Sequence, residues 1–113
     1  MEEQQTVFRK NLLTAVVNHQ TASVEITEIT LSKGQPVPKH YHPCPVVGYI
    51  KSGTVLFQIE GEDSVILREG DAFYEPKDKT ILHFDNASID QPLIFVAFYL
   101  KKADEPNIQI ISG

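Results

Sequence analysis

The chain has very little cysteine and no tryptophan. Cys44 is the only cysteine among 113 residues, so an internal disulfide framework is excluded. Because proteins without disulfides are typical of reducing compartments, we expect a cytoplasmic protein.

Long apolar runs and a surplus of basic residues are also missing. No stretch approaches the roughly 20 apolar residues of a membrane-spanning helix. The start, Met1 to Gln5, is acidic and polar where a signal peptide would be basic and then apolar. The net charge is −5, with 10 Lys and Arg against 15 Asp and Glu, whereas proteins that bind nucleic acids carry a basic face. We therefore expect neither a nucleic acid nor a membrane as partner.

Sequence signatures of several enzyme classes are absent too. The chain has no GxSxG nucleophile motif, no phosphate-binding P-loop and no glycine-rich dinucleotide fingerprint. Its glycines stand at expected turns instead, so these hydrolytic and nucleotide-dependent chemistries are set aside.

What the sequence does contain is a succession of short runs rich in Val, Ile, Phe, Tyr and Thr, separated by Gly, Pro, Asn and Asp. Such runs are typical of β-strands with turns between them. We predict strands at residues 24–31, 46–50, 55–59, 65–67, 72–75, 81–84, 93–100 and 108–111. Strands this short and numerous bury their edges best in a closed barrel, so the predicted fold is an all-β, antiparallel barrel or jelly roll enclosing a pocket.

The length fits one domain, residues 1–113, with a barrel core at about 24–100. Outside that core, Leu12-Leu13 and Val16-Val17 are apolar and could add a strand across a second subunit, and the C-terminal strand could pack there as well. We therefore expect a homodimer.

His40-Tyr41-His42 is the most informative stretch of the sequence. On an extended chain, side chains at i and i+2 point to the same side, so these two imidazoles can supply two ligands of one metal site. His19 lies outside this stretch and is interpreted as an ordinary turn residue.

Two groups of residues resemble the motifs of the cupin superfamily. The first motif is represented by Gly34, His40, His42 and Gly53, and the second by Gly70, Pro76, His83 and Asn86. The resemblance covers residues 24–100. It implies a small jelly-roll barrel with a divalent metal and, by analogy, a dioxygenase or isomerase acting on a small organic molecule.

The sequence departs from this family pattern at two positions. Val46 stands where the first motif usually has a metal-binding glutamate, and Ile81 stands where the second motif usually has its histidine. His83 follows two residues later, and two residues keep the same strand face. We therefore expect His83 either to face the barrel one step deeper or to be brought into register by the loop 77–79.

The resulting hypothesis is a divalent metal ion (Fe, Ni, Zn or Mn) bound by His40, His42 and His83, with open positions for water or a ligand. The alternative is a degenerate site in which these histidines bond to one another, to tyrosine hydroxyls or to water. That alternative corresponds to a non-catalytic domain that binds or senses a small molecule.

Two further residues could complete the site. Cys44 continues the parity of His40 and His42, so its sulfur could face the imidazoles, or it could simply fill space in a bent strand. Glu75 could replace the missing carboxylate as a ligand or serve as a general base. It shares a strand face with Phe73, which leaves the inward and outward orientations both open.

Aromatic residues are the remaining candidates for the small-molecule pocket. Depending on strand register, the pocket would be lined by some of Tyr49, Phe57, Phe73, Phe84 and Phe95. The same residues could serve only as the core of a small β-domain.

Overall fold

The computed structural model describes residues 7–102 and 106–111. Those residues form nine β-strands and no helix, in the order β1 (Ser23–Leu31), β2 (His40–Tyr41), β3 (Val46–Ser52), β4 (Thr54–Ile59), β5 (Val65–Arg68), β6 (Ala72–Glu75), β7 (Ile81–Asn86), β8 (Leu93–Lys101) and β9 (Gln109–Ile110). The predicted all-β fold is confirmed, and the predicted strands agree with the observed ones to within a few residues at each end. The short strand at His40–Tyr41 was not among those predicted.

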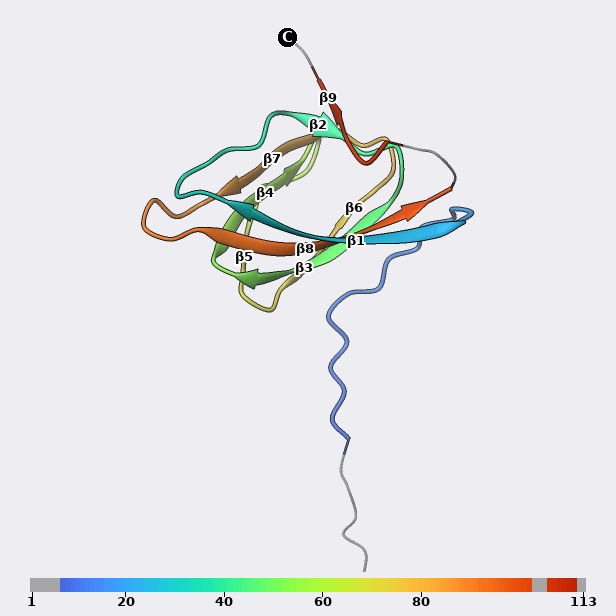
Figure 1. The fold of residues 1–113 in the computed structure, drawn as a ribbon, viewed down its shortest axis with the longest axis horizontal. Coiled ribbons are helices and arrows are strands. Elements are labelled where there is room, and N and C mark those ends of the chain that lie inside the picture. Colours follow the sequence, from blue (N-terminus) through green and yellow to red (C-terminus); the bar gives the residue numbers. More distant parts are fainter. Residues whose placement is uncertain (1–6, 103–105, 112–113) are drawn as a thin grey trace, which may run out of the picture.

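The strands form two sheets that face each other (Figure 1). One sheet has the order β1-β8-β3-β6 and the other β5-β4-β7-β2-β9, and every strand pairing is antiparallel. Neighbours in a sheet are often far apart in the sequence, as with β1 and β8, so the two motif regions are brought together by the fold. This arrangement is a jelly-roll barrel.

Four phenylalanines fill one end of the space between the sheets. Phe73 and Phe95 come from the first sheet, Phe57 and Phe84 from the second, and their rings contact one another with centroids 4.6 to 6.3 Å apart. Edge-on and tilted contacts of this kind stabilise a core beyond the area that they bury. The opposite end of the barrel, where β2 and β9 lie, is left for the candidate site (Figure 1).

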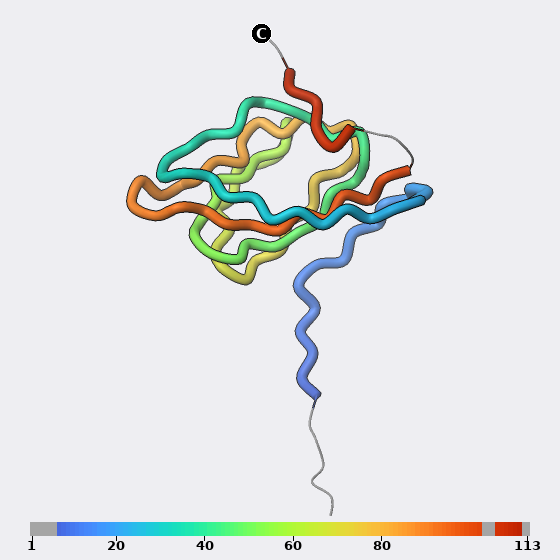
Figure 2. Tube along the Cα trace, in the orientation of Figure 1, coloured from blue at the N-terminus to red at the C-terminus, as the bar shows by residue number. Residues whose placement is uncertain are grey.

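The N-terminal arm, defined here as residues 7–17, contains no strand and runs away from the two sheets (Figures 1 and 2). Val7, Phe8 and Val16 on the arm are exposed, Phe8 at 90%. Leu12 and Leu13 lie with Val47 and other residues around a shallow depression on the outer face of the first sheet. Among the described residues, no helix is long and apolar enough to cross a membrane.

Candidate metal centre

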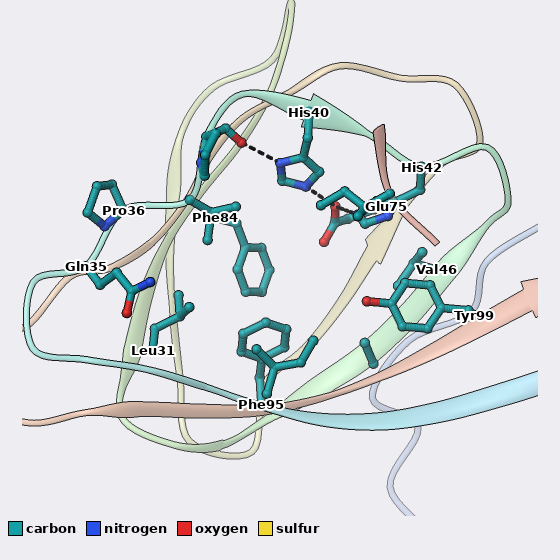
Figure 3. Close-up of a pocket in the computed structure, with 15 residues that line it drawn as sticks. Leu31, Gln35, Pro36, His40, His42, Val46, Glu75, Phe84, Phe95 and Tyr99 are labelled. Carbon is teal, nitrogen blue, oxygen red and sulfur yellow. Dashed lines mark hydrogen bonds and ion pairs between the residues drawn. The ribbon is translucent and has the colours of Figure 1, made fainter. Parts of the chain in front are cut away.

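Three buried donor groups meet near one mouth of the barrel. His40 lies on β2, His42 follows that strand, and Glu75 ends β6 on the opposite sheet. Each residue is buried, and one ligand atom from each lies within 4.8 Å of the others. Figure 3 shows both imidazoles directed towards the Glu75 carboxylate. The two histidines thus share a side of the chain, as their spacing predicts.

Backbone carbonyls hold both rings in this orientation. His40 Nδ1 lies 2.8 Å from the carbonyl oxygen of Pro38, and His42 Nδ1 lies 2.6 Å from that of Asn107. Because a carbonyl oxygen only accepts hydrogen bonds, each Nδ1 must carry the hydrogen and donate it. Each Nε2 is therefore the ring atom available as a ligand, which is the arrangement typical of metal-binding histidines.

The Nε2 atoms converge on one carboxylate oxygen. Glu75 Oε2 lies 2.8 Å from His42 Nε2 and 3.5 Å from His40 Nε2. With hydrogens on both Nδ1 atoms, the two neutral imidazoles would direct their Nε2 lone pairs at a lone pair of Glu75 Oε2. Because lone pairs repel one another, a positive charge must lie among these three atoms to make the contact favourable. That charge is either a proton on His42 or a metal cation.

The pKa values of the pair follow from these contacts. Burial alone lowers the pKa of His42, but the hydrogen bond to Glu75 and its negative charge outweigh burial, and the pKa is raised above 6.5. Burial alone raises the pKa of Glu75, but the hydrogen bonds and charges of His40 and His42 outweigh it, and the pKa is lowered below 4.5. Glu75 is therefore a carboxylate at neutral pH, and two imidazoles with one carboxylate are a donor set that fits a divalent transition metal.

Glu75 lies opposite the position where the family resemblance leads one to expect a carboxylate. Val46 on β3 pairs with Glu75 on β6, and both residues are buried. Directly paired residues in a sheet point to the same face, with side chains about 5 Å apart. The carboxylate is thus supplied from the neighbouring strand to the same region of the barrel. This placement decides the orientation of Glu75, which the sequence leaves open.

The structure does not bring His83 into this group, which corrects the expected set of three imidazoles. The His83 side chain is 46% exposed, and its Nδ1 lies 2.8 Å from Asp85 Oδ2. The cause is a bulge in β7: Gln58 pairs with His83 but the next residue, Ile59, pairs with Ile81. The residue between Ile81 and His83 is therefore extra, and it reverses the inward–outward alternation of the strand. As a result, Ile81 and Phe84 face inward while His83 faces outward.

His83 instead bonds to Asp85, a residue that holds the loop preceding His40. The other oxygen of Asp85 accepts a hydrogen bond from the backbone nitrogen of Val37. The buried Asn86, at the end of β7, also bonds to this loop. Its side-chain amide donates to the carbonyl oxygen of Ser32, and its backbone nitrogen donates to the carbonyl oxygen of Gln35. The second-motif residues therefore hold the first-motif loop in place.

Cys44 is fully buried in the hydrophobic core and does not belong to the group of possible metal ligands. Its flanking residues Pro43 and Pro45 interrupt regular pairing, so the chain does not continue as a strand from His42 to Cys44. The parity argument for an inward sulfur beside the imidazoles therefore does not apply.

A mainly apolar pocket of about 280 Å³ adjoins the three donors (Figure 3). Its walls are Ile29, Leu31, Gln35, Pro36, Val37, Pro38, Val46, Phe84, Phe95, Ala97, Tyr99 and Ile108, together with His40, His42 and Glu75.

Of the five aromatic residues predicted to line the pocket, Phe84 and Phe95 do so. Phe57 and Phe73 pack behind Phe84 in the core. Tyr49 points outward and is 39% exposed, because on β3 the residues Val46 and Ile50 face inward.

Two residues of the site were missed by sequence reasoning. Tyr99 lines the pocket, and its ring lies edge-on to His42 with centroids 5.8 Å apart. Burial, followed by the nearby charge of Glu75, raises the pKa of Tyr99 to about 12. The alternation of β8, which buries Phe95 and Tyr99 on one face, could have revealed it. The contribution of Asn107 is a backbone carbonyl, for which the sequence carries no signal.

The chain is a jelly-roll barrel with a buried set of donors that could hold a metal ion, and a comparison with protein families assigns it to a family. The family model described as "Cupin domain" matches residues 27–99. The chain belongs to this family, as the resemblance of its two motifs implies.

The similar proteins have low sequence identity to this chain. An uncharacterized protein of Methanocaldococcus jannaschii is 28% identical over 103 residues, which cover 88% of this chain and 89% of the relative. Among solved structures, an oxalate oxidase in complex with the substrate analogue glycolate is 22% identical with a TM-score of 0.67, covering 78% of this chain and 46% of the other. The DMSP lyase DddQ from Ruegeria pomeroyi DSS-3 is 20% identical with a TM-score of 0.67, covering 78% and 43%. The chain therefore spans less than half the length of these two enzymes.

Proposed function

We propose that this cupin binds one divalent transition-metal ion through His40, His42 and Glu75 and uses it in a reaction of a small organic molecule held in the adjoining pocket. The observation that carries the proposal is the convergence of both Nε2 atoms on Glu75 Oε2, with each Nδ1 already bonded to a carbonyl. Rings oriented in this way need no rearrangement to become ligands.

The donor set favours one of the two expected reaction classes. Two histidines and one carboxylate with open positions are typical of non-haem Fe(II) oxygenases, so we favour iron and a dioxygenase over an isomerase. When bound, the ion supplies a binding position for O₂ and a positive charge beside the substrate. A dioxygenase puts both oxygen atoms of O₂ into the organic product, so the substrate itself supplies the electrons and no separate reductant is needed.

The residues of the chain have three tasks in this proposal. The carbonyls of Pro38 and Asn107 orient the two imidazoles. Glu75 lowers the net charge of a bound divalent ion from +2 to +1. The apolar walls, among them Phe84 and Phe95, exclude water from the substrate and strengthen the electrostatic contacts at the ion.

A second function is favoured by the contact between His42 and Glu75. At 2.8 Å, a protonated His42 pairs with the Glu75 carboxylate without any metal ion. In addition, Val46 and Ile81 occupy the positions of two ligands that the family motifs usually have. A barrel stabilised in this way could bind a small molecule without a metal and act as a sensor. The fold itself hosts different activities, so only the site can decide between the two.

Metal content of the protein purified without a His-tag tests the proposal. Wild type should carry or take up nearly one equivalent of Fe, Ni, Zn or Mn, and the His40→Ala/His42→Ala variant should lose it. The matched control is His19→Ala/His83→Ala, which removes the other two of the four histidines and should keep the metal. If wild type holds no metal after anaerobic reconstitution, the metal-dependent function is refuted and the metal-free binding domain remains.

We also propose that two copies associate through the N-terminal arm. The arm carries exposed Val7 and Phe8, while Leu12 and Leu13 contact an apolar depression on the sheet of the same chain. A copy related by a twofold axis can cover both surfaces with the same contacts made twice. Light scattering should give a dimer for wild type and a monomer for Phe8→Asp, whereas Ile89→Asp, at an exposed apolar residue away from the arm, should stay dimeric. A wild-type monomer at all concentrations would refute the arrangement.

The cytoplasmic location stays a proposal and rests on the single cysteine. Fractionation of the native host, with the chain recovered outside the cytoplasm, would contradict it.

A further inference from the structure

The pocket has an uneven distribution of polar groups. His40, His42, Glu75 and the hydroxyl of Tyr99 lie towards one end, and the exposed Gln35 lies at the other (Figure 3). Between them the walls are aliphatic and aromatic, with Leu31, Phe84 and Phe95 among the lining residues. Among the described residues that line the pocket there is no Lys and no Arg. A ligand that fits these walls has one polar end and an apolar body.

The Tyr99 hydroxyl is available to such a ligand. Figure 3 shows its oxygen directed into the pocket. Among the described residues it forms no hydrogen bond, although the side chain is largely buried. Buried tyrosine hydroxyls usually have a partner. A phenol also carries its hydrogen at neutral pH, so it can donate to an acceptor oxygen of a bound molecule.

The charge of the site limits how much negative charge the ligand can carry. A divalent ion with one carboxylate and two neutral imidazoles carries +1, which one negative charge on the ligand neutralises. A second negative charge between the donors and Gln35 would lie against apolar walls, where the described lining residues offer no Lys or Arg to pair with it, and burying an unpaired charge is costly. The volume of 280 Å³ equals that of about nine water molecules in the liquid, so the ligand has about ten non-hydrogen atoms.

From these contacts we infer that the ligand is a small organic monoanion, a carboxylate or enolate with an apolar body, whose charged oxygen accepts a hydrogen bond from Tyr99. This inference rests on the proposed metal site and names its substrate class. It also separates this chain from a site for a compact dianion, because an apolar body is required to fill the apolar part of the pocket, which Leu31 and Phe95 help to line.

Calorimetric titrations with two probes of equal size test the inference. Phenylacetate and adipate both have about ten non-hydrogen atoms, but adipate carries a second carboxylate. Metal-loaded wild type should bind phenylacetate at least about 10-fold more tightly than adipate. Tyr99→Phe should weaken phenylacetate binding about 10-fold, the usual loss of one hydrogen bond to a charged group. The matched control Tyr49→Phe removes a hydroxyl from the outer face and should bind as wild type does.

The metal content of every sample separates this inference from the proposed function. If wild type and Tyr99→Phe hold equal metal and bind phenylacetate equally, Tyr99 is not the donor and the inference fails while the function stands. It also fails if adipate binds as tightly as phenylacetate, or if phenylacetate, benzoate and hexanoate all fail to bind. If no metal is held but phenylacetate binds and is weakened by Tyr99→Phe, the hydrogen bond from Tyr99 stands, whereas the metal-dependent function and the charge argument built on it fail.

Discussion

Replacing Glu75 with glutamine should weaken metal binding roughly 100-fold. Structural zinc sites with four ligands bind with about 10–16 kcal/mol in total, so one ligand contributes on the order of 3 kcal/mol, which is about 100-fold in Kd. Glu75 is the only anionic member of the group and is 3% exposed. Glutamine keeps the size of the side chain but removes the charge, so the loss measures the carboxylate itself.

The assay is competition between the metal-free protein and a chromophoric chelator for Zn²⁺ or Co²⁺ at constant pH. The matched control is His83→Ala, which removes the imidazole that the sequence favours as a ligand. With a side chain 46% exposed and bonded to Asp85, His83 should be dispensable, and the Kd should change by less than about 3-fold. If His83→Ala weakens binding as much as Glu75→Gln does, or if Glu75→Gln has no effect, the proposed ligand set is wrong.

Three further predictions concern the same residues and the core. In the metal-free protein, the raised pKa of His42 gives stability that is lost as pH rises above 6.5, and the lowered pKa of Glu75 gives stability that is lost as pH falls below 4.5. Melting temperatures measured across pH should therefore peak between these two values. A flat profile would contradict the ion pair. Removing residues 106–113 takes away the carbonyl that orients His42 and should weaken Zn²⁺ binding about 10- to 100-fold in the competition assay; unchanged affinity would refute that positioning role. Gly48→Ala would place a methyl group against a carbonyl of β8 and a phenylalanine ring, at a cost of about 3 kcal/mol in urea unfolding. Gly61→Ala has open space and only an unfavourable φ of 86°, at a cost of about 1–2 kcal/mol; equal losses would show that the close packing at Gly48 is not decisive.

The strands and the histidine pair were predictable because they depend on short-range alternation. Val55, Phe57 and Ile59 share the inner face of β4 as their spacing requires, and His40 and His42 share a side in the same way. The family motifs then indicated a barrel. Alternation states which residues share a face, but it does not state which face is inward.

Three features of the site depended on the pairing of distant segments. Glu75 faces the histidines because β6 pairs with β3 and places it opposite Val46. His83 leaves the site because β7 has a bulge where it pairs with β4.

The third feature is the C-terminal segment, which pairs with β2 and brings the Asn107 carbonyl to His42 across 65 residues of sequence. The amino-acid sequence by itself therefore determined the all-β barrel and two of the candidate metal ligands, since both follow from local periodicity. Only the tertiary structure decided the third candidate ligand, the exclusion of His83 and the inward hydroxyl of Tyr99, because each depends on the register between strands that are far apart in the chain.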